Sequence, residues 1–271
     1  MKKVKGLIKS MVSLLLGGLL VTSCQNEDFN GPIKAEGKGA ITLNLNAMTG
    51  FDTETKAVNE SAYSNKNNYT VEIKNSHGDL VVSKLFSSLS FPYTLDLGSY
   101  VVRAYYGQNY KEVAATQDGF YVEGESSFTL DVNEDNQVTA KSVSLTCMPT
   151  HAKVQSTFSS DMSTYYSSYY VTYKVGNTET AKVENTDPWY LLVNKNGETV
   201  TATIHLTTKE GYVTNKDFVL TKTKELKPNE SWTLSMSPTY EQKTGSLGIS
   251  ITIDETTEEH EIVINVPSDW V

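Results

Sequence analysis

From residue 39 to the C-terminus, apolar and polar residues alternate in short runs, and this period of two constrains the fold more than any other feature. Residues 40–46 read Ala-Ile-Thr-Leu-Asn-Leu-Asn, and residues 248–253 read Gly-Ile-Ser-Ile-Thr-Ile. Successive side chains of a β-strand point to opposite faces of its sheet, so the alternation predicts strands with one buried face. Many short strands separated by turns are typical of β-sandwiches and barrels. We therefore expect an all-β protein.

Pro149 separates the expected strands into two groups, because proline lacks the N–H that a central strand donates. This predicts one antiparallel β-sandwich over residues 39–148 and a second over residues 149–271. Residues 47–68 are polar and predict a long exposed loop, and residues 159–168 are the one segment that suggests a helical turn. Hairpin turns are expected at residues 75–79 and 133–136. The expected strands are residues 40–46, 69–74, 80–85, 91–97, 100–106, 127–132 and 137–146, then 152–158, 169–175, 189–193, 199–206, 212–220, 231–236, 248–253 and 261–266.

Residues 1–23 have the pattern of a secretory signal peptide. Four lysines come before residue 10, and the apolar run that follows over residues 11–21 is shorter than the roughly 20 residues that span a bilayer. Val21-Thr-Ser-Cys24 resembles the lipobox of bacterial lipoproteins. The resemblance implies cleavage before Cys24 and the attachment of palmitate-type acyl chains there. The alternative is an ordinary signal peptide with a chance cysteine. Residues 24–38 would form a flexible tether.

The acidic residues of the chain limit the classes of partner that we expect and indicate a location. Removal of residues 1–23, which hold four lysines and no acidic residue, changes the formal charge from −9 to −13. A strongly acidic chain argues against nucleic acid and anionic membrane surfaces as partners, because both are polyanions. Glu27 and Asp28 resemble the acidic export signal of Bacteroidota-type lipoproteins, which implies an outer-membrane protein facing the cell surface. A periplasmic location is the alternative. Cys147, in an alternating run, is expected to be a small buried group, with a reactive or bridged thiol as the alternative.

Two neighbouring segments carry a family resemblance. Residues 70–82 have the form x-V-x-I-x with a following G-x-x-V, and residues 94–104 match L-x-L-G-x-Y-x-V-x-A. This pair resembles transthyretin-like or Ig-like sandwich domains, in which Tyr100 would close the end of the core. Together with the lipobox, it resembles fimbrillin-type and related surface lipoproteins of Bacteroidota. In that family the first strand is removed by cleavage in the following loop, which here would fall at Lys56, where the family has arginine. An uncleaved chain is the alternative that we favour.

Sequence signs of catalysis or metal binding are weak. His77, His151, His205 and His260 lie far apart, without the spacing of a zinc site. Residues 131–136 imitate the start of a calcium loop, but Asn136 stands at the sixth position, where glycine is needed. No G-x-S-x-G motif occurs. We expect no cofactor, no metal and no catalytic residue, although carboxylates paired only in space stay open as an alternative.

Aromatic residues give the clearest indication of binding. Tyrosines crowd residues 165–170, and tryptophans follow at 189 and 232. Exposed rings can stack on sugars, so Tyr169, Tyr170, Trp189 and Trp232 are candidate glycan contacts. The alternative is that these rings fill the core or its rim.

The function predicted from the sequence is that of a lipid-anchored cell-envelope protein in surface adhesion or fimbriae, without catalysis. Its expected partners are the membrane, through the lipid on Cys24, and other envelope proteins or glycans. A glycan-binding accessory lipoprotein is the main alternative, and an enzyme is a weaker one.

Overall fold

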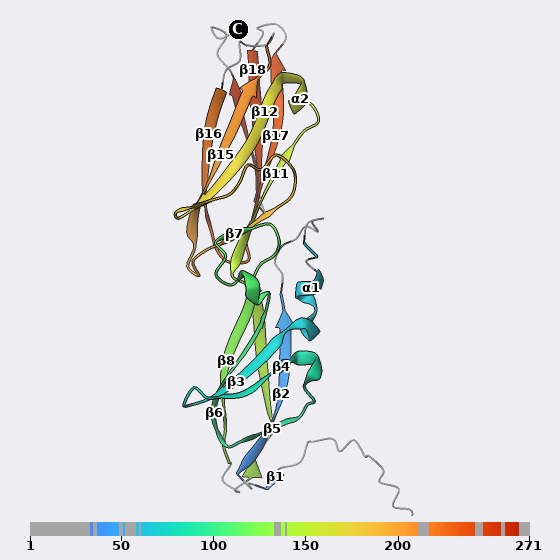
Figure 1. Cartoon of the computed structure of the whole chain (residues 1–271), viewed down its shortest axis with the longest axis vertical. Helices are drawn as coiled ribbons and strands as arrows, with labels where there is room; N and C mark the ends of the chain where they lie inside the picture. Colours follow the sequence, from blue (N-terminus) through green and yellow to red (C-terminus); the bar gives the residue numbers. More distant parts are fainter. Residues whose placement is uncertain are drawn as a thin grey trace, which may run out of the picture. The chain divides into compact units, whose positions relative to one another are not determined.

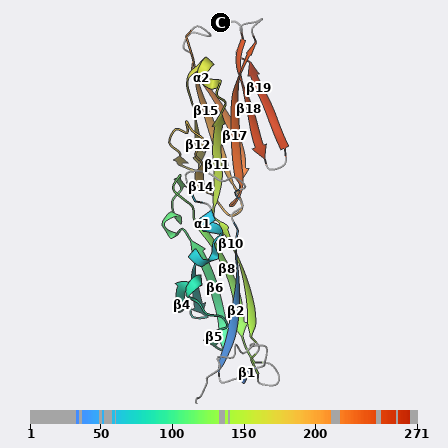
Figure 2. The ribbon, with the colours of Figure 1, turned by 90° about the vertical axis from the view of Figure 1, so that its right-hand side faces the viewer.

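The computed structural model describes residues 33–34, 37–48, 51, 58–59, 61–132, 137–138, 140–210, 217–241, 246–255 and 258–265. Strands dominate these residues, which confirms the all-β prediction (Figures 1 and 2). All of them lie within one compact unit, Pro32–Val271.

The first group of strands forms a seven-stranded sheet in the order β4-β3-β6-β8-β10-β2-β5. A separate pair joins β1 (Ile33–Lys34) to β9 (Gln137–Val138). The sheet contains β2 (Lys38–Ala47), β3 (Thr70–Asn75), β4 (Leu80–Leu85), β5 (Tyr93–Asp96), β6 (Gly98–Tyr106), β8 (Val122–Leu130) and β10 (Lys141–Pro149).

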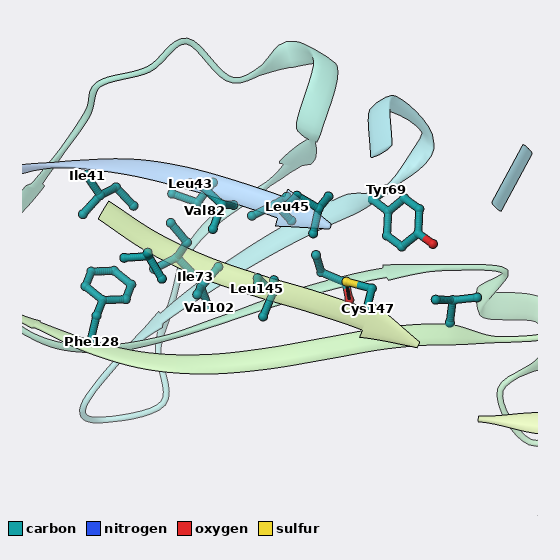
Figure 3. Packing of buried hydrophobic residues seen from close by; sticks show 14 of the residues in the cluster. Ile41, Leu43, Leu45, Tyr69, Ile73, Val82, Val102, Phe128, Leu145 and Cys147 are labelled. Carbon is teal, nitrogen blue, oxygen red and sulfur yellow. Dashed lines mark hydrogen bonds between the residues drawn. The ribbon is translucent and has the colours of Figure 1, made fainter. Parts of the chain in front are cut away.

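Strand β10 divides this sheet into two facing parts. It pairs with β2 in parallel from Lys141 to Cys147, and with β8 only at Met148 and Pro149. Apolar side chains from β2 and β10 therefore pack against those of β3, β6 and β8 (Figure 3). Tyr100 is buried there and stacks on Phe128 with ring centroids 5.4 Å apart, as the sandwich resemblance implies.

The turn of the hairpin expected at residues 133–136 lies outside the described residues, and the ladder between the strands on either side of it is short. Strands β8 and β10 are antiparallel, but their ladder is confined to two residue pairs, whereas β10 pairs with β2 from Lys141 to Cys147. The parallel pairs β2–β10 and β11–β17 also depart from the purely antiparallel prediction. Alternation fixes which face of a strand is buried, but it does not determine which strand lies alongside.

The long exposed loop predicted over residues 47–68 is wrong for the part that the structure describes. Phe51, Val58 and Tyr63 are buried, and this region contains α1 (Ser61–Ser64) and the 3₁₀ turn η1 (Lys66–Asn68). Single apolar residues in a polar segment show no period, so their burial gives no sequence signal. The helical turn expected at residues 159–168 is present as α2 (Met162–Tyr165), but two more 3₁₀ turns occur, η2 (Phe86–Ser88) and η3 (Gln108–Tyr110).

The second group of strands forms two sheets around one core. The six-stranded sheet has the order β19-β18-β17-β11-β14-β7, and the four-stranded sheet has the order β13-β12-β15-β16. Figure 2 shows β17, β18 and β19 side by side in one layer. Trp232, Tyr173 and Ile204 are fully buried in the core. The strands are β7 (Ala115–Thr116), β11 (His151–Phe158), β12 (Tyr166–Val175), β13 (Thr178–Glu179), β14 (Trp189–Leu192), β15 (Glu198–Thr208), β16 (Asp217–Leu226), β17 (Ser231–Glu241), β18 (Ser246–Glu255) and β19 (Glu258–Asn265).

One short strand crosses between the two groups. β7 lies between β6 and β8 in the chain, yet it pairs with β14, with Thr116 opposite Tyr190 and Ala115 opposite Leu191. Strands β10 and β11, which flank Thr150, belong to different sheets. The domain boundary between residues 148 and 149 stays a prediction. Strand β7 precedes that boundary in the chain but pairs with a strand that follows it.

Candidate functional site

An open groove of about 540 Å³ lies where the segment with α1 and η1 meets the end of β6 and the turn η3. Its lining combines aromatic rings with amide and carboxylate side chains. The residues relevant to its chemistry are Asn59, Tyr106, Gln108, Asn109, Tyr110 and Asp118.

A cluster of packed aromatic rings supports one wall of the groove. Tyr63 stacks on Phe120 with centroids 3.8 Å apart, and Tyr106 meets the Tyr63 ring edge-on at 4.9 Å. The Tyr69 hydroxyl donates to the Tyr63 carbonyl oxygen at 2.6 Å, and the Phe120 N–H donates to the Tyr63 hydroxyl at 3.2 Å. Burial raises the pKa of Tyr69 well above its usual value, so this hydroxyl stays protonated as a donor.

Two glycines let the loops of the groove approach each other. Gly107 has φ +76°, and a Cβ there would collide with the Phe120 carbonyl oxygen. A Cβ on Gly119 would lie 2.5 Å from the Tyr110 ring and 2.6 Å from the Tyr63 hydroxyl. Neither position has room for a side chain, and the Tyr110 ring occupies the space above Gly119.

The polar rim of the groove has unused hydrogen-bonding capacity. Gln108, Asn109 and Asp118 are exposed, and the Asp118 backbone N–H donates to Thr116 Oγ1 at 3.0 Å. Across the described residues, the side chains of these three residues have no hydrogen bond or ion pair to the protein. The two amides can donate and accept, and the carboxylate can only accept.

A second polar cluster, on the outer face of β6, is satisfied internally. Arg103 contacts Glu123 Oε2 through Nε at 3.0 Å and Nη2 at 2.8 Å, and its Nη2 also donates to the Tyr121 hydroxyl. The Tyr105 hydroxyl donates to Glu72 Oε1 at 3.0 Å. Because these groups satisfy one another, the cluster braces the sheet and leaves little capacity for a ligand.

The structure disperses the four aromatic residues predicted to contact glycans. Trp232 is 1% exposed and meets Tyr173 edge-on in the core, so this part of the prediction is wrong. Trp189 is half-buried and packs against the same core. Tyr169 contacts Phe158 at 5.0 Å, whereas Tyr170 stacks on His205 at 4.4 Å.

Adjacent strand residues point to opposite faces, which separates Tyr170 from the core-facing rings. For Tyr169, Tyr170 and Trp189, glycan contact stays a prediction. Sequence reasoning missed the groove tyrosines because Tyr63, Tyr106 and Tyr110 come from two separate segments.

The other residues considered from the sequence have structural surroundings. Cys147 is buried as expected, and burial raises the pKa of its thiol to about 12. His151 is fully buried, with Nδ1 3.0 Å from Thr150 Oγ1 and Nε2 3.1 Å from the Val113 carbonyl oxygen. Its burial lowers the pKa of the imidazole to about 4. Within the described ranges, no three His, Cys, Asp or Glu residues gather as metal ligands.

Several predictions fall outside the described residues. Cys24, Lys56, the signal peptide and most of the tether belong to this part of the chain, and the side chain of His260 is also not described. None of the helices in the described ranges has the length and apolar character to cross a membrane.

The sheets and their two cores define a β-sandwich protein, and the comparisons place it in a family. The chain belongs to the family named DUF4493, a domain of unknown function, whose model matches residues 37–268. No curated protein sequence matches the chain.

Several solved structures are similar in architecture. A proposed adhesin from Bacteroides ovatus has a TM-score of 0.44 and 10% identity, over 86% of this chain and 99% of that one. The fimbrial anchor protein Mfa2 from Porphyromonas gingivalis has a TM-score of 0.41 and 11% identity, over 85% and 100%. A proposed polysaccharide-binding protein from Bacteroides thetaiotaomicron has a TM-score of 0.38 and 10% identity, over 84% and 98%.

Proposed function

We propose that this chain is a lipid-anchored protein of the outer membrane, displayed at the cell surface, with a structural role in adhesion or fimbriae. The observation that carries the proposal is Val21-Thr-Ser-Cys24, directly after a basic segment and a short apolar run. A diacylglycerol on the Cys24 sulfur together with an N-acyl chain provides more than one buried lipid tail, which is enough for stable anchoring.

The connection between the two cores supports a mechanical role. An anchored adhesion protein transmits force between its lipid and whatever it contacts, so its parts must resist separation. Phe51, Phe120 and Tyr190 form one cluster with ring centroids 4.8–5.6 Å apart. The Leu192 N–H also donates to the Ala114 carbonyl oxygen at 2.9 Å, next to the β7–β14 pairing. These contacts link the first group of strands to the second.

The anchor is tested by exchanging each of the two cysteines. In the Cys24→Ala variant the protein should move from the membrane fraction to the soluble fraction of cell envelopes. Cys147→Ala is the matched control, because Cys147 is buried and its removal should leave the protein with the membrane. A Cys24→Ala protein that stays in the membrane fraction would refute the lipid anchor. Digestion of intact cells by an added protease tests surface display, and a fully protected protein would indicate a periplasmic one.

The same preparations test cleavage at Lys56. Strand β2 lies between β10 and β5 and contributes Ile41, Leu43 and Leu45 to the core. Its removal would expose two strand edges and an apolar slot, which another strand could fill. We expect the protein to stay intact and its envelope form to begin at Cys24. Mass spectrometry that finds a form beginning at Ala57 would establish maturation by strand removal instead.

A further inference from the structure

We propose that the groove between α1 and η3 binds an uncharged oligosaccharide through Tyr106, Tyr110 and Asp118. The inference would supply the adhesive function with a ligand. It depends on the chemistry of the groove and not on the lipid anchor, so either proposal can fail alone.

The groove has the two kinds of group that a sugar needs. One face of a pyranose ring presents C–H groups, which pack on flat aromatic rings, and its edge presents hydroxyls that both donate and accept. Tyr106 and Tyr110 are half-buried and line the groove. Next to them the Gln108 and Asn109 amides and the Asp118 carboxylate are exposed. The amides match hydroxyls in either role, and the carboxylate accepts from one or two of them.

The arrangement is held in place before any ligand arrives. The ring of Tyr106 is fixed by edge-on contact with Tyr63, which itself stacks on the buried Phe120. The Tyr110 ring lies over Gly119, and any larger residue at position 119 would collide with that ring. A binding surface that is already ordered loses less conformational entropy on binding. The volume of about 540 Å³ also falls within the range of roughly 300–1,000 Å³ that is common for small-molecule sites.

Charge selects among glycans. Among the described residues, the lining includes Asp118 and no lysine or arginine, and the whole chain has a formal charge of −9. A uronic acid, sulfated or sialylated glycan would place negative charge beside this carboxylate, and the described lining residues offer no cation to compensate it. The geometry therefore favours neutral hexose and N-acetylhexosamine units.

The other aromatic sites fit a sugar less well. Tyr170 already has His205 stacked on its ring, and the Lys182 ammonium group lies 4.4 Å from the ring centroid. Trp232 is inaccessible in the core. Tyr240 of β17, which is 41% exposed and does not line the groove, serves as the matched control.

The test uses the full chain with Cys24→Ala, on an array of uncharged oligosaccharides built from glucose, mannose, galactose and N-acetylglucosamine, with sulfated and uronic-acid glycans alongside. Titration calorimetry with the best uncharged glycan then compares variants. We expect saturable binding, a loss of about tenfold or more for Tyr110→Ala, and a smaller loss for the nearly isosteric Asp118→Asn. Tyr240→Ala should bind as tightly as its parent.

Three results would overturn the proposal. The first is that no uncharged oligosaccharide on the array binds saturably. The second is that Tyr110→Ala and Asp118→Asn both bind as tightly as the parent chain, with unchanged melting temperatures. The third is a preference for the anionic glycans. Thermal unfolding of each variant separates loss of the site from loss of the fold.

Discussion

The molecule contains two aromatic regions, the tyrosines of residues 165–170 and those of the groove. The sequence points to the first as a binding surface, whereas the structure favours the second. Residues 165–170 hold four tyrosines in a short segment, but the structure sends Tyr166 into the core, where its hydroxyl donates to the Gly248 carbonyl oxygen, and places Tyr170 on the other face of the sheet. Tyr63, Tyr106 and Tyr110 are separated in sequence, yet they meet at one groove. Crowding along a strand divides rings between two faces, whereas a surface site is assembled by loops that converge in space.

The largest expected effect separates a core ring from a groove ring. Trp232→Ala should lower the free energy of unfolding by about 3–5 kcal/mol, because it leaves a large cavity among fully buried side chains. Tyr110→Ala, at a half-buried position, should cost no more than about 1 kcal/mol. Urea denaturation of both variants measures the difference. Equal losses of stability in the two variants would show that Trp232 and Tyr110 do not differ as core and surface residues.

A sharper version of this comparison uses Trp232→Phe. The Trp232 Nε1 is buried and has no hydrogen-bond partner among the described residues. Phenylalanine keeps most of the ring volume and removes the unsatisfied donor. We therefore expect a smaller loss than for Trp232→Ala in the same denaturation experiment.

The next effect concerns His151, whose hydrogen bond to Val113 links β11 to the segment that follows the groove. Its folded-state pKa of about 4 lies below the usual 6.5, so the unfolded chain binds the proton more readily. The neutral imidazole contributes its full share to the free energy of unfolding above about pH 6.5, and this share is lost as the pH falls towards 4. The full contribution is about 3 kcal/mol.

Unfolding measured between pH 7 and pH 4 tests this contribution. His151→Gln should flatten the pH dependence, because glutamine can still donate to Val113 without taking up a proton. An unchanged slope in His151→Gln would show that other groups carry the acid sensitivity.

The sequence predicted the local features of the fold but not the contacts between distant segments. The alternation at residues 40–46 predicted a strand and the face that it buries, because both are local properties. At residues 248–253 it predicted the strand, but the polar Ser250 is buried there as well as its apolar neighbours. It did not predict that β10 runs parallel to β2, since pairing partners are chosen by contacts far apart in the chain. The burial of Phe51 and the placement of β7 beside β14 were missed for the same reason.

The groove was harder to predict than the fold. Gly107 and Gly119 allow the close contacts of the groove. Glycines are common in polar loops, however, so their presence alone does not predict a groove. Only the three-dimensional path of residues 58–70 and 105–120 brings Tyr63 beside Tyr106 and Tyr110. The sequence indicated aromatic residues as candidate contacts, but one of them, Trp232, lies in the core, and no pattern pointed to the tyrosines of the groove.

A smaller effect tests whether the groove is rigid. Gly119→Ala should displace the Tyr110 ring and lower stability by about 1–3 kcal/mol, because the added Cβ overlaps Tyr110 and the Tyr63 hydroxyl. The displacement can be followed through the chemical shifts of the Tyr110 ring. A variant with unchanged shifts and unchanged stability would show that the loops open easily and that the groove is not preordered for a ligand.

The smallest expected effect is that of Tyr170→Ala, and it tests the comparison from the other side. Tyr170 lies on the outer face of the four-stranded sheet, where its ring contacts His205 and the Lys182 ammonium group. Loss of one stacked pair and one cation–π contact at a half-exposed position should cost less than about 1 kcal/mol in urea denaturation. A cost as large as that of Trp232→Ala would mean that the tyrosines of residues 165–170 act together as one core element. A small cost, with saccharide binding intact, would leave them as sheet packing and the groove as the aromatic surface open to a ligand.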